Sequence, residues 1–128
     1  MEFALVLPLL VLMLLGMMDY GWYFFVEINT SAAAREGART ATTFPGSCPN
    51  PAASSAAASA VTSRIADIGY AATTTVTTTC STLADGDPQF EVQVQVLFPQ
   101  LTGFTLLPMP RQGNDVRAFA RSTMRGVH

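Results

Sequence analysis

The sequence predicts an α+β protein in which a long N-terminal helix precedes a small domain with a second helix, a short antiparallel sheet and one disulfide. Three observations predict this fold: an almost entirely apolar N-terminal segment, an alanine-rich segment after a Pro/Gly break, and a strictly alternating segment further on. The chain has 128 residues. We expect the helix over residues 1–43 and the domain over residues 44–128, which at about 85 residues is near the lower end of domain size.

The N-terminal segment has the length and composition of a membrane span. Residues 3–18 carry no charge, and the apolar character continues past Asp19 to Val26. Such a helix can cross a hydrocarbon core of ~30 Å, so we interpret residues 1–26 as a membrane-spanning or filament-core half. The competing interpretation is a cleavable signal peptide, which would carry basic residues before the apolar core and a small-residue cleavage site. This chain instead starts Met-Glu and continues as a helix into Glu27.

Small residues line one face of the second half of this helix. They follow the i, i+3, i+4, i+7 spacing and comprise Thr30, Ala33, Ala34, Gly37, Ala38 and Ala41. Such a face lets another backbone approach closely, either the domain of the same chain or a neighbouring helix. The helix propensity of alanine alone also explains the composition. The opposite face carries Glu27, Arg35, Glu36 and Arg39, and Phe44-Pro45-Gly46 predicts an end near Thr43.

The remaining elements follow from changes in period. Residues 51–68 predict a second helix with Pro51 in its first turn and Gly69 as its stop. Residues 73–79 and 90–98 predict strands, the second with an alternating apolar face, and Asp-Gly-Asp-Pro at 85–88 predicts the turn between them. Residues 101–110 form a Gly/Pro-broken connection. Residues 115–125 alternate like a third strand, with a short amphipathic helix as the alternative.

The two cysteines, Cys48 and Cys80, lie outside the apolar segment. An even count beyond a membrane span indicates an oxidising compartment and one disulfide. A zinc site would need more ligands than two thiols and the single histidine, His128. The Asp85-Gly86-Asp87 triplet lacks the further oxygen ligands and closing glutamate of an EF-hand. We therefore expect no metal and no cofactor.

Charge and motif content exclude two function classes. Seven arginines and no lysine against nine acidic residues give a net charge of −2 without a basic run, which argues against nucleic acid as a partner. Arg111, Arg117, Arg121 and Arg125 are spaced singly, as on one solvated face. No nucleophile elbow, metalloprotease or P-loop spacing occurs, and we expect no enzyme. The threonine run at residues 73–79 is explained by a strand or by O-glycosylation, and neither requires a catalytic hydroxyl.

Three short segments together resemble the TadE-like family of pilin-like proteins of the Tad (tight adherence) apparatus. They are Glu2-Phe3-Ala4-Leu5-Val6-Leu7-Pro8-Leu9-Leu10, Asp19-Tyr20-Gly21 and Ala33-Ala34-Arg35-Glu36-Gly37-Ala38-Arg39. The resemblance covers about the first third of the chain and is specific as a set. It implies a type IV pilin-like protein that a prepilin peptidase cuts, that the inner membrane holds by its helix, and that a secretion ATPase and membrane platform draw into a filament.

The resemblance also implies roles for residues of the first helix. In related pilins a glutamate at the membrane edge follows the cleavage site by a few residues, so Glu2 implies a mature chain that begins slightly upstream of Met1 or starts differently. A carboxylate in a helical bundle is tolerated beside a positive group, and the N-terminus of a neighbouring subunit is its natural partner. The alternative places Glu2 at the headgroup level. Pro8 would let the helix bend.

Asp19 has two candidate roles, the outer membrane boundary and a second inter-subunit contact. The expected assembly residues are Glu2, Phe3, Pro8 and Asp19. Two hypotheses follow. The first is a structural subunit, a minor pilin, a pseudopilin or the main subunit of a filament, whose partners are copies of itself or other pilins and which lies in the inner-membrane lipid before assembly. The second is a stably anchored periplasmic adaptor or binding module that does not polymerise.

Overall fold

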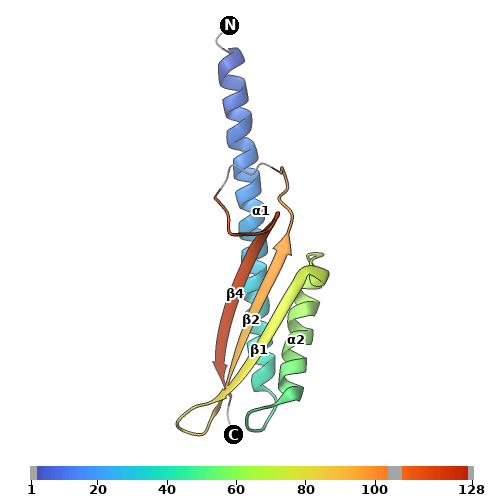
Figure 1. Ribbon diagram of the computed structural model, residues 1–128, viewed down its shortest axis with the longest axis vertical. Coiled ribbons are helices and arrows are strands. Elements are labelled where there is room, and N and C mark those ends of the chain that lie inside the picture. Colours follow the sequence, from blue (N-terminus) through green and yellow to red (C-terminus); the bar gives the residue numbers. More distant parts are fainter. Residues whose placement is uncertain (1–2, 104–107, 127–128) are drawn as a thin grey trace.

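Two helices and a sheet pack as two layers around one apolar core (Figure 1). The computed structural model describes residues 3–103 and 108–126. The elements in chain order are α1 (Phe3–Thr42), α2 (Pro51–Ala66), the short 3₁₀ helix η1 (Ala71–Thr73), β1 (Thr74–Thr82), β2 (Pro88–Phe98), β3 (Arg111–Gln112) and β4 (Asp115–Arg125). The predicted fold class, with its long apolar helix, second helix, antiparallel sheet and disulfide, is confirmed.

The helix ends lie close to their predicted positions. Helix α1 ends at Thr42, one residue before the predicted end. Helix α2 starts as its sequence predicts, because Asn50 caps it by accepting a hydrogen bond from the Ala53 N–H at 3.1 Å and Pro51 occupies the first turn. It ends at Ala66 rather than at residue 68. Gly69 follows with φ +84°, a conformation that favours glycine.

The four strands form one antiparallel sheet in the order β1-β2-β4-β3. The segment 115–125 is a strand, as its alternation indicated, and it pairs with β2 with Val94 opposite Ala120. Strand β3 was not predicted because its two residues are too short to show a period. The first strand begins at Thr74, since Thr73 belongs to η1. The predicted connection over residues 101–110 lies partly outside the described residues.

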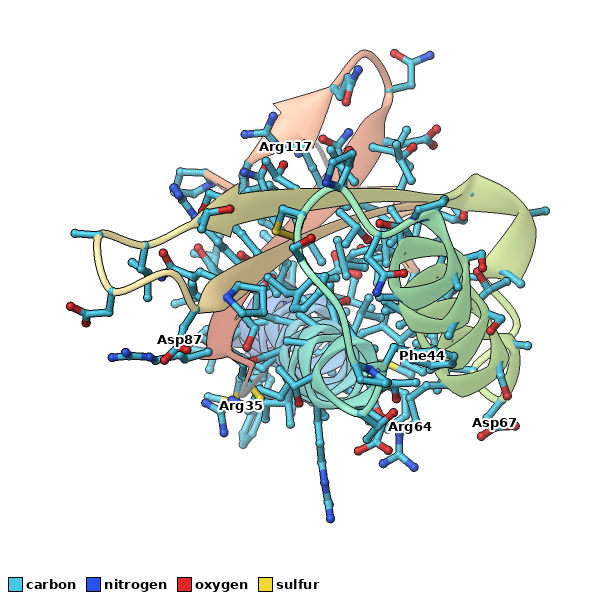
Figure 2. The ribbon with its side chains drawn as sticks, turned by 90° about the horizontal axis from the view of Figure 1, so that it is seen from below. Arg35, Phe44, Arg64, Asp67, Asp87 and Arg117 are labelled. Atoms are coloured by element: carbon cyan, nitrogen blue, oxygen red, sulfur yellow. A yellow bond between two sulfur atoms is a disulfide. The ribbon has the colours of Figure 1, made fainter. Side chains whose placement is uncertain are left out.

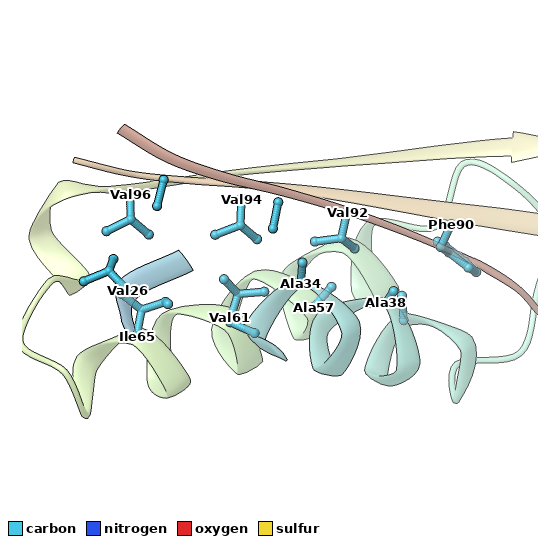
Figure 3. Packing of buried hydrophobic residues seen from close by; sticks show 14 of the residues in the cluster. Val26, Ala34, Ala38, Ala57, Val61, Ile65, Phe90, Val92, Val94 and Val96 are labelled. Carbon is cyan, nitrogen blue, oxygen red and sulfur yellow. The ribbon is translucent and has the colours of Figure 1, made fainter. Parts of the chain in front are cut away.

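The core lies between the inner face of the sheet and the two helices (Figure 3). Every second residue of β2 is buried, and these residues are Pro88, Phe90, Val92, Val94, Val96 and Phe98. They face small residues of α1 such as Ala34 and Ala38, and the Ala57, Val61 and Ile65 stripe of α2. The small side chains of the helices leave room for the larger strand residues, so both layers approach closely.

The small-residue face of α1 packs against the domain of the same chain. All six of its residues are buried, with Gly37 against Val61 of α2. One residue assigned to the opposite face was misplaced: Arg35, Glu36 and Arg39 are exposed, but Glu27 is half-buried beside β4. The physical reason is that Glu27 lies three residues before Thr30 and seven before Ala34, which places it on the flank of the small-residue face, and β4 packs along α1 there (Figure 1).

The disulfide joins Cys48, in the connection between the helices, to Cys80 of β1. This bond confirms the predicted pairing and fastens the interhelical connection to the sheet. Arg117, Arg121 and Arg125 are exposed on the outer face of β4, as predicted, while Arg111 lies on β3. Arg125 forms ion pairs with Asp85 and Asp87 of the β1–β2 turn, at 3.1 and 2.6 Å.

Candidate functional site

The first half of α1 projects from the rest of the molecule (Figure 1). Its large apolar side chains are exposed from Phe3 to Leu14 and again at Met17 and Met18, with Leu15 half-buried between them. Among the described residues α1 is the one helix long and apolar enough to cross a membrane, with a mean hydropathy of 2.1 over its most apolar stretch. This half therefore presents an apolar surface that the chain itself does not cover, which fits a membrane anchor.

Two of the predicted assembly residues, Phe3 and Pro8, lie in this projecting half. Phe3 begins α1 and is 86% exposed, and Pro8 lies within the helix, which continues through it. Glu2 lies outside the described residues. The single chain does not bring Phe3 and Pro8 into contact with the domain, so their assembly role stays a prediction. The absence of a backbone N–H at Pro8 removes one helical hydrogen bond there.

Asp19 marks the point at which α1 reaches its own domain. Its side chain is 4% exposed, and one carboxylate oxygen accepts a hydrogen bond from the Thr102 backbone N–H at 3.1 Å. The other oxygen accepts from the Thr102 hydroxyl. The carboxylate therefore holds the connection that follows β2 against the helix. The sequence offered no signal for Thr102, because 83 residues separate the two positions.

An aromatic cluster surrounds this junction. Tyr23 of α1 and Tyr70 lie against Phe98 of β2, with ring centroids 6.4 and 5.9 Å away. Trp22 contacts Tyr70 edge-on at 6.5 Å and stacks on Phe25 at 5.4 Å. Tryptophan and tyrosine are enriched where a membrane meets water. The cluster thus closes the end of the core that faces the apolar half of α1.

Exposed apolar residues continue on α1 beyond Asp19, on the side away from the sheet. Phe24, Phe25 and Ile28 are 55%, 45% and 67% exposed. Their spacing places them on one helical face with Met17, Met18 and Gly21. The charged and exposed residues Arg35, Glu36 and Arg39 come only later (Figure 2 labels Arg35). The uncovered apolar face therefore continues into the part of α1 that the domain contacts on the opposite side of the helix.

Glu27 is the carboxylate in an unusual environment. Burial raises the pKa of Glu27 above the ordinary carboxyl range, and the nearby Phe119 backbone N–H partly offsets this effect. Its Oε2 atom is buried without a hydrogen-bond partner. The sequence indicated a solvated glutamate here, so this feature was missed. Two spacings could have found it: Glu27 follows Asp19 and Tyr23 at i+8 and i+4, and it precedes Thr30 and Ala34 by three and seven residues, which places it near the buried face.

The described residues contain no group of three or more His, Cys, Asp or Glu placed to hold a metal ion. A long helix that is apolar and uncovered in its first half, and packed against a small α+β domain in its second, fits a pilin-like component. The family model described as TadE-like protein matches residues 1–39. The resemblance predicted from the N-terminal segments is therefore confirmed, and this family is pilus-related and structural rather than enzymatic. No curated protein and no solved structure matches the chain.

Proposed function

We propose that the protein is a pilin-like structural subunit of a Tad or type IV-like pilus, a minor pilin or pseudopilin, with the main filament subunit as the further possibility. Before assembly the inner membrane holds residues 1–26, and residues 44–128 form the domain outside the cytoplasm. Prepilin peptidase and the assembly platform then act on it. Its partners in the filament are copies of itself or other pilins, whose helices form the apolar filament core.

The observation that carries this proposal is the extent of the uncovered apolar face of α1. From Phe3 to Ile28 this face spans about 39 Å of helix, more than the ~30 Å of a hydrocarbon core. Its last part lies level with the domain, which contacts α1 from Asp19 onward. A simple anchor needs no apolar face beside its own domain. Neighbouring helices packed side by side would cover it.

The test is electron microscopy and mass spectrometry of filaments sheared from the producing cells. We expect the wild-type chain in the filaments and the Ile28→Glu variant only in the membrane, because a carboxylate at this 67% exposed position would enter the packed core without a partner. Thr62→Glu, at an exposed position of α2, is the matched control and should still enter filaments.

Three outcomes separate the hypotheses. A dominant amount in the filaments indicates a main subunit, and a trace amount indicates a minor pilin. Complete absence of the wild-type chain from sheared material, with the protein retained in the inner membrane, would contradict the proposal and favour the anchored adaptor. Equal incorporation of Ile28→Glu and wild type would show that the exposed apolar face of α1 is not packed in the filament, and would contradict the observation on which the proposal rests.

A further inference from the structure

Strand β1 forms an outer edge of the sheet, and its sequence has none of the usual protective features. Within the described residues, β1 pairs only with β2 (Figure 1). It is nine residues long, Thr74–Thr82, and contains no charged residue and no proline. Its register with β2 is continuous, without a bulge. Natural proteins normally protect a long edge strand with charged residues, proline or a bulge, so an edge strand without them is a template for another strand.

The alternation of backbone hydrogen bonds shows which groups face outward from this edge. The Leu83 N–H donates to the Asp87 carbonyl at 2.9 Å, so Leu83 and Asp87 are a hydrogen-bonded pair. In the register of β1 with β2, the backbone N–H and C=O groups of the odd-numbered residues of β1 therefore point toward β2. In an antiparallel pair successive residues alternate in this respect. The backbone N–H and C=O groups of Val76 and Thr78 therefore point to the open edge. The Thr74 carbonyl also points there, while its N–H bonds to Ala71.

Burial of the inner face is also incomplete at β1. The inward residues Thr74, Val76 and Thr78 are only half-buried, whereas the inward residues of β2 are fully buried. Val76 packs against the edge of the core cluster. A further strand beside β1 would complete the burial of Val76. At β1 the sheet therefore has backbone groups without a neighbouring strand and inward side chains that no neighbouring strand covers.

The sequence of this edge is complementary to itself. Residues 73–79 read Thr-Thr-Thr-Val-Thr-Thr-Thr and form a palindrome around Val76. Two copies in antiparallel orientation, centred on this residue, place valine opposite valine and threonine opposite threonine throughout. Threonine pairs across strands are favourable, and the absence of charge removes any repulsion between identical edges. A two-fold interface requires this kind of self-complementarity.

We propose that the open edge of β1 binds a second copy of this chain, whose own β1 adds in antiparallel orientation with Val76 opposite Val76. The two Val76 residues exchange backbone hydrogen bonds, and each Thr78 N–H reaches the Thr74 carbonyl of the other copy. The two sheets become one continuous sheet. This contact goes beyond the filament-core packing of α1 and uses a different surface.

The surroundings of the edge leave space for this second strand. A groove of about 490 Å³ lies at its Cys80 end, lined by residues of the connection before α2, of α2 and of β1: Pro49, Asn50, Pro51, Ser54, Thr78 and Cys80. The residues at 73 and 74 of the second copy would enter there. Ser54 and, one turn later, Ala58 present small side chains on this side of α2, so two α2 helices can approach under the joined sheet.

The two-fold geometry has a topological consequence. The strands run along α1 (Figure 1), so antiparallel pairing of β1 directs the two apolar helix halves to opposite ends of the pair. Two copies in the same membrane, with their helices parallel, cannot form this contact. It joins copies on facing membranes or on filaments of opposite direction.

Cysteine cross-linking of the full chain in detergent tests the register. Val76→Cys should shift from monomer to disulfide-linked dimer under mild oxidation, because hydrogen-bonded partners lie about 5.5 Å apart between Cα atoms, within disulfide reach. Thr74→Cys lies on the same edge, but its copies would be four residues apart along the strand, about 14 Å, and should stay monomeric. Peptide mapping verifies that Cys48–Cys80 remains paired.

A second measurement tests the edge in the chain without new cysteines. Thr78→Pro removes an N–H that faces the open edge and not β2, so the sheet should keep its fold, as circular dichroism checks. Wild type should sediment as a dimer and Thr78→Pro as a monomer. A monomeric wild type, or equal cross-linking of Val76→Cys and Thr74→Cys, would overturn the proposal.

Vesicles test the orientation. Val76→Cys chains with tags of two sizes are reconstituted separately, and the vesicles are mixed before oxidation. Dimers that combine both tags are expected, because the pairing joins facing membranes. Dimers with one tag size only would mean pairing within one membrane and would overturn the antiparallel arrangement.

Discussion

At the scale of single residues, Gly37 sets how closely α1 approaches α2. A Cβ atom at this position would lie 2.5 Å from Cγ2 of Val61 and 3.3 Å from the Ala57 carbonyl oxygen. Val61 is branched at Cβ and buried, so its side chain has little freedom to move. The glycine is therefore required by packing and not by backbone conformation.

We expect Gly37→Ala to destabilise the domain by about 1–3 kcal/mol, the usual cost of overpacking. Thermal and denaturant unfolding of the full chain in detergent would measure it. Gly21→Ala is the control, since a Cβ there meets nothing within 4 Å and alanine favours helix. Equal stability of Gly37→Ala and wild type would show that the two helices separate easily.

Glu27 couples stability to pH. Its pKa is raised in the folded state, so the folded chain holds this proton more tightly than the unfolded chain does. Below an ordinary carboxyl pKa of about 4.3 both states are protonated and no cost arises. As pH rises through the raised pKa, the folded state must bury an ionised carboxylate and loses stability.

Glu27→Gln should therefore gain stability over wild type as pH rises from about 4, whereas the two proteins should differ by a constant amount below that pH. Melting temperatures of both chains across a pH series measure the difference. Glu36→Gln, an exposed position of the same helix, reports the loss of one solvated carboxylate. A Glu27→Gln difference that does not change with pH would contradict the expected linkage.

At the scale of elements, carboxylates of α1 organise the end of the sheet. Asp19 accepts hydrogen bonds from the backbone N–H and the hydroxyl of Thr102, and Glu27 lies beside the Phe119 backbone of β4. Between them the aromatic cluster of Tyr23, Tyr70 and Phe98 closes the core. These contacts fix the connection after β2 and the flank of β4 to one helix, which makes α1 the structural axis of the domain.

Asp19→Ala should loosen the connection after β2, because it leaves the Thr102 N–H without its acceptor at a cost of about 1–3 kcal/mol. Hydrogen exchange over residues 99–103 should accelerate, while exchange in the middle of β2 stays slow. Asp67→Ala, at an exposed position after α2, is the matched control and should change neither. Unchanged exchange at residues 99–103 would show that other contacts hold this connection.

At the scale of the whole molecule, α1 has two halves with different surroundings. The second half is covered by the domain through its small-residue face, whereas in the first half residues 3–14 are exposed on all sides and burial begins only near Asp19. The molecule therefore needs a lipid or protein environment for the first half, since such a large apolar surface is costly in water. The proposed function supplies the lipid environment before assembly and the protein environment in the filament afterwards.

Under that proposal Glu2→Lys should abolish filaments and leave membrane insertion intact, because a positive charge would replace the carboxylate expected to pair with a neighbouring N-terminus. Membrane fractionation and electron microscopy of sheared material measure the two properties. Glu36→Lys, a charge reversal on the exposed side of α1, is the control. A stable anchor predicts little effect of either substitution.

The sequence alone determined the elements whose residues repeat with a clear period. The uncharged run of residues 3–18, the alternation of residues 90–98 and the Pro51 and Gly69 signals each define local structure, because backbone geometry fixes which side chains share a face. The cysteine count likewise predicted the bond between Cys48 and Cys80. The weaker alternation of residues 115–125 was sufficient to favour a strand.

Only the tertiary structure decided which surfaces meet. The small-residue face fitted either a neighbouring helix or the same chain, and it packs on the same chain. The Asp19 contact with Thr102, the burial of Glu27 and the two-residue strand β3 all depend on segments distant in sequence. The physical reason is that a period specifies the face of an element and not its partner, which closure of the whole chain selects.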